Sequence, residues 1–116
     1  MNYFEKANDL YNAHLYVKAI EMYRKSLEIK ENEAASLYNS AVCYIKLKKY
    51  NDAITLLKNA VSMKKESKYF FNLGYCYAMI NNNKKALINF NTAWALDNND
   101  VECEKAINLI MKKQAK

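Results

Sequence analysis

The sequence predicts an all-α protein, and three observations lead to this expectation. The chain has 116 residues, of which one is glycine and none is proline, so it lacks the residues that form the turns of β-rich folds. Its hydrophobic share of 52% is typical of a globular protein. Apolar residues recur at helical spacing, as at Leu37, Ala41, Tyr44 and Ile45. At this length, one domain with a sizeable core is expected.

A pattern about as long as two helices occurs three times. Segments that begin at Ala19, Ala53 and Ala86 align with one another, at offsets of 34 and 33 residues. Large apolar residues stand 16 positions before each alanine: Tyr3, Leu37 and Phe70. Repeats of this period indicate stacked helical units. We expect the three alanines to be buried where helices approach closely.

The periodicity divides each repeat into two helices and leaves a seventh at the end. The expected helices span 2–13, 16–30, 35–47, 50–63, 68–80, 83–96 and 100–114. Turns are expected at His14-Leu15, at 81–83 and at 97–100, where Asn and Asp can cap helices. The acidic segment 97–104 lacks the glycine and the ligand spacing of a calcium loop. We therefore interpret it as a turn and a helix cap.

The period and the pattern resemble the tetratricopeptide repeat, whose first helix carries the motif W-x2-L-G-x2-Y. Phe70, Leu73, Gly74 and Tyr77 of the third repeat match this motif best. The equivalent residues are Tyr3, Lys6, Ala7 and Leu10 in the first repeat, and Leu37, Ser40, Ala41 and Tyr44 in the second. The resemblance implies a right-handed α-solenoid of three antiparallel helix pairs plus a capping helix. It would form a single domain over 1–116, with repeats at about 2–33, 34–66 and 67–100.

Residues 101–116 resemble the C-terminal capping helix of this family. Its expected apolar face consists of Ala106, Ile107, Ile110 and Met111. This face would cover Trp94 and Leu96. Lys112, Lys113 and Lys116 would then face water.

Residue types that would indicate an enzyme or a metal centre are sparse. His14 is the only histidine and is expected in a turn, and no cysteine stands near it at ligand spacing. Cys43, Cys76 and Cys103 are odd in number and form no CxxC pair, so three reduced, buried thiols are expected. We predict no enzymatic activity, no cofactor and no metal. No apolar run is long enough for a membrane span, and the cytoplasm is the expected location.

The formal net charge of +6 raises the question of nucleic acid as a partner. Arg24 is the only arginine among the 18 cationic residues, whereas base reading and bidentate phosphate contacts favour arginine. The lysines are also scattered along the chain and lie mostly at expected helix ends. We predict no specific nucleic-acid binding. Abundant asparagine and lysine indicate an AT-rich coding sequence instead.

The family resemblance also implies where a ligand would bind, because the first helix of each pair lines a concave groove that holds a peptide. We call the residues at these positions the groove residues. They are Phe4, Asn8, Tyr11 and Asn12, then Tyr38, Asn39, Val42 and Lys46, then Lys68, Phe71, Asn72, Tyr75 and Met79.

Two interpretations of the groove residues stay open. In some family members, Lys, Asn and Arg side chains clamp two carboxylates of a chaperone tail. Asn8, Asn39 and Lys68 match that clamp, but Phe4 and Asn72 do not. The alternative is a row of aromatic side chains, formed by Phe4, Tyr38 and Phe71 at one equivalent position of the three repeats. Packing on neighbouring helices would also explain that row.

The expected function is therefore that of a non-catalytic adaptor, which binds an extended peptide or a protein tail, acidic or apolar in character. The alternative is a self-associating assembly module, or a piece of a larger protein of the same family. We expect a monomer or a weak homodimer. The fold alone does not identify the partner.

Overall fold

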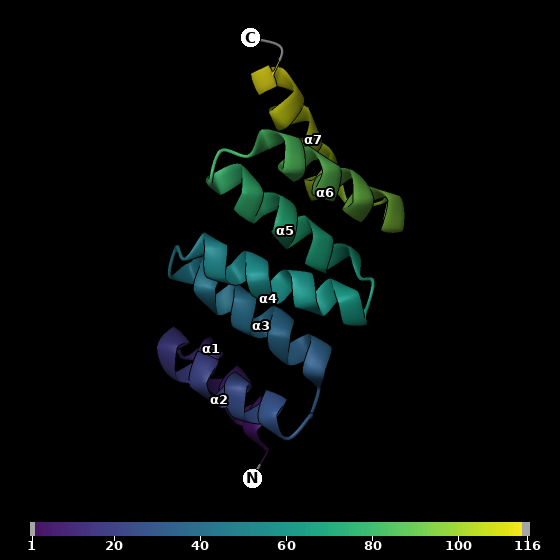
Figure 1. Cartoon of the computed structure of the whole chain (residues 1–116). Coiled ribbons are helices and arrows are strands. Elements are labelled where there is room, and N and C mark those ends of the chain that lie inside the picture. Colours follow the sequence, from purple (N-terminus) through teal and green to yellow (C-terminus); the bar gives the residue numbers. More distant parts are fainter. Residues whose placement is uncertain (1, 115–116) are drawn as a thin grey trace. The chain divides into compact units, whose positions relative to one another are not determined.

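The computed structural model describes residues 2–114 and contains, within them, seven α-helices (Figure 1). These are α1 (Tyr3–Asn12), α2 (Tyr16–Glu28), α3 (Glu33–Lys46), α4 (Tyr50–Met63), α5 (Ser67–Met79), α6 (Asn83–Leu96) and α7 (Val101–Gln114). Each expected helix is present, and its ends lie within two residues of the expected ones. The all-α fold class is thus confirmed. The chain divides into two compact units between Lys64 and Lys65.

The first unit contains α1–α4, and small residues lie at its helix contacts. Ala7 and Ala19 are fully buried and form a core cluster with Tyr23 and Cys43. Ala53 of α4 is fully buried as well. A small side chain at such a contact lets two helix backbones approach closely. The predicted burial of these alanines is therefore confirmed, and that of Ala86 in α6 likewise.

The turn inside each helix pair follows one pattern. His14, Lys48 and Asn81 each adopt a positive φ at the second residue after the first helix of a pair. In the first pair, the amide of Leu15 donates to the carbonyl of Leu10 at 2.9 Å, and that of His14 to Tyr11 at 2.9 Å. This is the Schellman arrangement, which normally favours glycine at the left-handed position. In this chain, non-glycine residues adopt the left-handed conformation at all three of these turns.

The turns between repeats differ in length, as the change in period predicts. Residues 29–32 join α2 to α3, whereas residues 64–66 join α4 to α5. The second connection is one residue shorter. The chain is extended there, with φ −150° at Lys64 and φ −121° at Glu66.

The second unit contains α5–α7, and Gly74 of α5 lies at its contact with α6. A Cβ atom at residue 74 would lie 2.6 Å from the Phe90 ring of α6. Real Cβ atoms essentially never approach a neighbour this closely, so an alanine here would force the Phe90 ring to shift.

The C-terminal helix α7 packs on α6, but not through the expected face. Cys103 and Ile110 are its buried residues, at 0% and 6% exposure. Met111, expected on the apolar face, is 56% exposed, and Trp94 and Leu96 remain 39% and 50% exposed. These three expectations were wrong. Cys103 and Ile110 are seven residues apart and share one face, whereas Met111 is turned about 100° away from Ile110.

The other residues expected in the capping helix differ in their burial. Ala106 and Ile107 are half-buried, and Lys112 and Lys113 are exposed as expected. Lys116 lies outside the described residues. Within residues 2–114, no helix combines the length and the apolar character that crossing a membrane requires.

Candidate functional site

A pocket of about 400 Å³ lies in the first unit, among helices α1, α2 and α3. Its lining residues are Asn8, Tyr11, Asn12, Tyr23, Tyr38, Asn39 and Val42. Six of these seven are groove residues predicted from the sequence. Residues 8, 11 and 12 belong to α1, and residues 38, 39 and 42 belong to α3. Residues three and four apart share one helix face, so each helix contributes one row of side chains to the pocket.

A hydrogen-bond network crosses this pocket and joins all three helices. The hydroxyl of Tyr23 on α2 donates to Asn8 Oδ1 on α1. Asn39 Nδ2 on α3 donates to the same oxygen over 3.2 Å. Asn8 Oδ1 on α1 thus accepts two hydrogen bonds, one from each of the two helices that follow it. The network fixes the orientation of all three side chains.

Tyr23 is the lining residue that the sequence analysis did not include. The equivalent position in the other repeats holds Leu57 and Phe90, and this apolar pattern is typical of a core residue. Tyr23 is indeed only 1% exposed. Burial raises the pKa of Tyr23 from 10.0 to about 12, with a smaller contribution from Cys43. The available signal was the hydroxyl itself, which neither Leu57 nor Phe90 carries.

The aromatic residues of the predicted row are in different surroundings. Phe4 packs edge-on against Tyr23, with ring centroids 6.0 Å apart. Phe71 packs against Phe90 of α6 at 5.3 Å. Both are half-buried. Tyr38 lines the pocket instead. The role of Phe4 and Phe71 in ligand binding stays a prediction.

The groove residues of the second unit lie on α5. Asn72 Nδ2 donates to the carbonyl of Lys68, one turn earlier in the same helix, at 2.8 Å. Lys68 Nζ lies 3.9 Å from Glu66 Oε2. Tyr75 and Met79 are 38% and 46% exposed. Lys46, at the end of α3 in the first unit, is exposed and does not line the pocket.

The three cysteines are free and buried, as expected. Burial raises the pKa of Cys43 from 9.0 to about 11, and those of Cys76 and Cys103 to about 12. Their thiols therefore stay protonated at neutral pH, and the thiolate is the reactive form. These cysteines fill space in the core.

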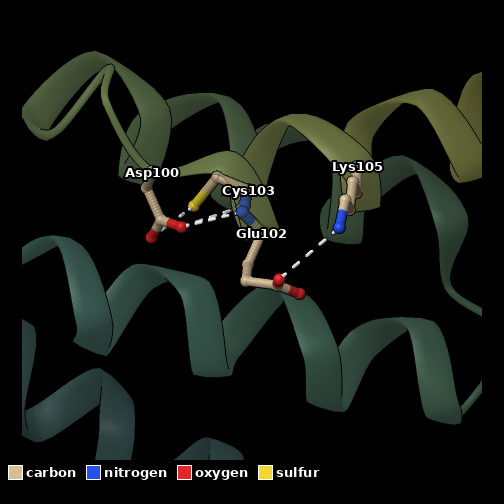
Figure 2. A network of polar contacts seen from close by, with 4 residues as sticks. All are labelled: Asp100, Glu102, Cys103 and Lys105. Carbon is tan, nitrogen blue, oxygen red and sulfur yellow. Dashed lines mark hydrogen bonds and ion pairs between the residues drawn. The ribbon is translucent and has the colours of Figure 1, made fainter.

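Asp100 caps α7, as predicted for the acidic segment before it. Figure 2 shows the arrangement: Asp100 Oδ1 accepts from the amides of Glu102 at 3.0 Å and Cys103 at 3.3 Å. The thiol of Cys103 donates to Asp100 Oδ2 at 3.4 Å. Over residues 2–114, no three metal-ligating side chains gather at one place.

His14 is exposed in its turn, as expected. Its Nδ1 forms a hydrogen bond of 2.7 Å with the hydroxyl of Tyr16.

The helix pairs and the motif residues at their contacts define a helical-repeat protein. A family model described as "Anaphase-promoting complex, cyclosome, subunit 3", which is of the tetratricopeptide type, matches residues 2–60. The chain belongs to the tetratricopeptide-repeat family, and the resemblance seen in the sequence is confirmed.

Curated relatives carry the same pattern within much longer chains. Heat shock protein STI1 of Saccharomyces cerevisiae is 28% identical over 114 residues, which are 97% of this chain and 19% of the relative. A TPR repeat-containing protein of Methanocaldococcus jannaschii, MJ1428, is 23% identical over 98% of this chain and 21% of its own length. The chain thus spans about a fifth of these relatives.

Solved structures of similar fold agree closely. The first TPR domain of Spaghetti (RPAP3), bound to the HSP90 peptide SRMEEVD, has a TM-score of 0.94 and 22% identity. That match covers 98% of this chain and 91% of the other. YrrB, described as a TPR protein with an unusual peptide-binding site, has a TM-score of 0.88 and 23% identity, over 97% of this chain and 58% of YrrB. At this identity, the likeness establishes the fold.

Proposed function

We propose that this chain is a non-catalytic interaction module that binds an extended peptide segment or a protein tail. The observation that carries the proposal is the pocket among α1, α2 and α3. Six of its seven lining residues were predicted from the groove positions of the repeat. A pocket of about 400 Å³ lies within the range of about 300–1,000 Å³ that ligand sites occupy.

Relatives support the same class of ligand. Two domains of similar fold are described in complex with chaperone peptides, namely SRMEEVD of HSP90 and SGPTIEEVD of HSP70. We propose the same role here, with peptides or proteins as partners. The three free, buried thiols support a cytoplasmic location.

A peptide array tests the proposal directly. The labelled full chain is exposed to an array that includes both chaperone tails and varied internal sequences, and hits are measured by fluorescence anisotropy. Tyr38→Ala should weaken binding at least tenfold, because an aromatic residue in a pocket typically contributes about 2 kcal/mol or more. Tyr50→Ala is the matched control, since Tyr50 is a half-buried tyrosine of the same unit outside the pocket.

The outcome of the array is decisive in both directions. Absence of any hit, or equal loss in the two variants, would contradict the proposal. Sedimentation over a dilution series addresses the alternative of self-association. A monomer that persists at high micromolar concentration supports the peptide-binding function.

A further inference from the structure

We propose that the pocket of the first unit receives an uncharged side chain, with its flanking peptide group, from an internal stretch of the partner, and that a terminal carboxylate is disfavoured there. This inference rests on the proposed function and specifies the chemistry of its ligand. An aromatic side chain is the best occupant, since it fits a pocket lined by tyrosine, asparagine and valine.

The composition of the lining is the first argument. Three asparagines, three tyrosines and one valine form the wall, and none of them is charged at neutral pH. A carboxylate loses hydration when it enters a pocket, and it needs a cation or several donors in return. The lining holds no lysine or arginine. Phe4, which stands where the carboxylate clamp would require a lysine, packs on Tyr23 instead.

The polarity of the hydrogen-bond network is the second argument. Asn8 Oδ1 accepts from both Tyr23 and Asn39. This leaves Asn8 Nδ2, which carries N–H donors, and Asn39 Oδ1, which is an acceptor, for a ligand. A peptide group presents one acceptor and one donor and can satisfy both atoms. A carboxylate presents acceptors alone and would leave Asn39 Oδ1 without a donor.

Burial keeps the Tyr23 hydroxyl protonated, so that it remains a hydrogen-bond donor. With its pKa raised to about 12, the phenol stays protonated and continues to donate to Asn8 Oδ1. The orientation of the Asn8 amide is therefore fixed over the neutral pH range.

A matched pair of small probes tests the inference. N-acetyl-tyrosine N-methylamide is neutral, and N-acetyl-tyrosine carries a free carboxylate on the same ring and backbone. Each is titrated into the ¹⁵N-labelled full chain, and the side-chain amide signals of Asn8 and Asn39 are followed by NMR. We expect the neutral probe to shift these signals with millimolar affinity, and the carboxylate probe to bind at least threefold more weakly.

Two results would overturn the inference. One is equal or tighter binding of the carboxylate probe. The other is no shift with either probe at concentrations of several tens of millimolar. Peptide hits on the array together with either result would leave the proposed function standing, so the two failures are distinguishable.

A change of charge sharpens the test. Asn12 lines the pocket and is exposed at the end of α1, so Asn12→Lys places a cation at the site without altering the core. It should raise the affinity for the carboxylate probe several-fold relative to the neutral one, and added salt should remove the gain. Asn59→Lys adds the same charge on the exposed face of α4 and should change neither affinity. Equal effects of the two variants would contradict a local role.

Discussion

The helix pairs α1–α2 and α5–α6 are built on one pattern, yet they fill the same contact differently. Phe4 packs on Tyr23 in the first pair, and Phe71 packs on Phe90 at the equivalent positions of the other. Position 7 is alanine in α1, whereas its counterpart in α5 is Gly74. The Phe90 ring occupies the space that a Cβ at Gly74 would need. The residue at position 7 or 74 and the ring packed opposite it, Tyr23 or Phe90, therefore depend on each other in size.

The polar sides of the two pairs differ as well. Tyr23 carries a hydroxyl that reaches Asn8 Oδ1 and joins the network with Asn39. In α5, the counterpart of Asn8 is Tyr75, and Asn72 donates to its own helix at Lys68. The hydroxyl of Tyr23 on α2 is thus the group of the second helix that joins the polar network of the pocket. The comparison teaches that repeats of one fold reach different sites through few substitutions.

The largest effect should come from Gly74→Ala. Helix propensity alone favours alanine by about 1 kcal/mol, but overpacking against Phe90 should reverse the sign and cost about 1–3 kcal/mol. Urea denaturation gives the free energy of unfolding. Adding Phe90→Leu should relieve part of the loss, because the two positions are in contact. A Gly74→Ala protein as stable as the wild type would refute the close contact.

Tyr23→Phe should have the next largest effect. It removes the donor to Asn8 Oδ1 and keeps the ring packed on Phe4, so a loss of about 0.5–1.5 kcal/mol in unfolding free energy is expected. Tyr3→Phe is the matched control in the same unit and should change stability by less than about 0.5 kcal/mol. If both substitutions have the same small effect, the network does not stabilise the first pair.

The pH dependence of stability should separate the two helix pairs. The pKa of Tyr23 is about 12 in the folded chain, against its ordinary value of 10.0. Folding therefore favours the protonated phenol. Its contribution is complete below pH 10 and is lost as the pH rises toward 12. The stability difference between wild type and Tyr23→Phe should narrow over that range, as measured by urea denaturation at several pH values.

The thiols of Cys76 and Cys103 titrate in both proteins, so their contribution cancels in that difference, whereas Cys43 is coupled to Tyr23 and contributes to it. A gap that stays constant between pH 9 and 11 would contradict the burial of the Tyr23 hydroxyl. The α5–α6 pair has Phe90 at the position equivalent to Tyr23, and this side chain does not titrate.

Lys68→Ala should have the smallest effect. Its Nζ lies 3.9 Å from Glu66 Oε2, and its side chain is 61% exposed, so water and salt screen the pair. We expect a loss of about 0–1 kcal/mol in unfolding free energy. If Lys68→Ala abolished peptide binding while Tyr38→Ala preserved it, the carboxylate clamp would be the correct interpretation of the groove.

Most of the candidate site could be predicted because it follows from the repeat. Register places Asn8, Tyr11 and Asn12 on one face of their helix, and Tyr38, Asn39 and Val42 on one face of the next. The family resemblance then names that face as the groove. Tyr23 could not be found in this way. Its equivalents are Leu57 and Phe90, so the repeat pattern indicates a core position and does not show that the side chain also lines a pocket.

The sequence alone determined the seven helices, the repeat period and the buried alanines, because these depend on local periodicity and on the size of single residues. The tertiary structure decided which faces meet. It turned Cys103 rather than Met111 into the core and left Trp94 exposed. It also brought Tyr23 of α2 and Asn39 of α3 within hydrogen-bond distance of the same oxygen, Asn8 Oδ1 of α1. Such contacts depend on how helices are rotated against each other, and a rotation of one residue, about 100°, exchanges a buried side chain for an exposed one.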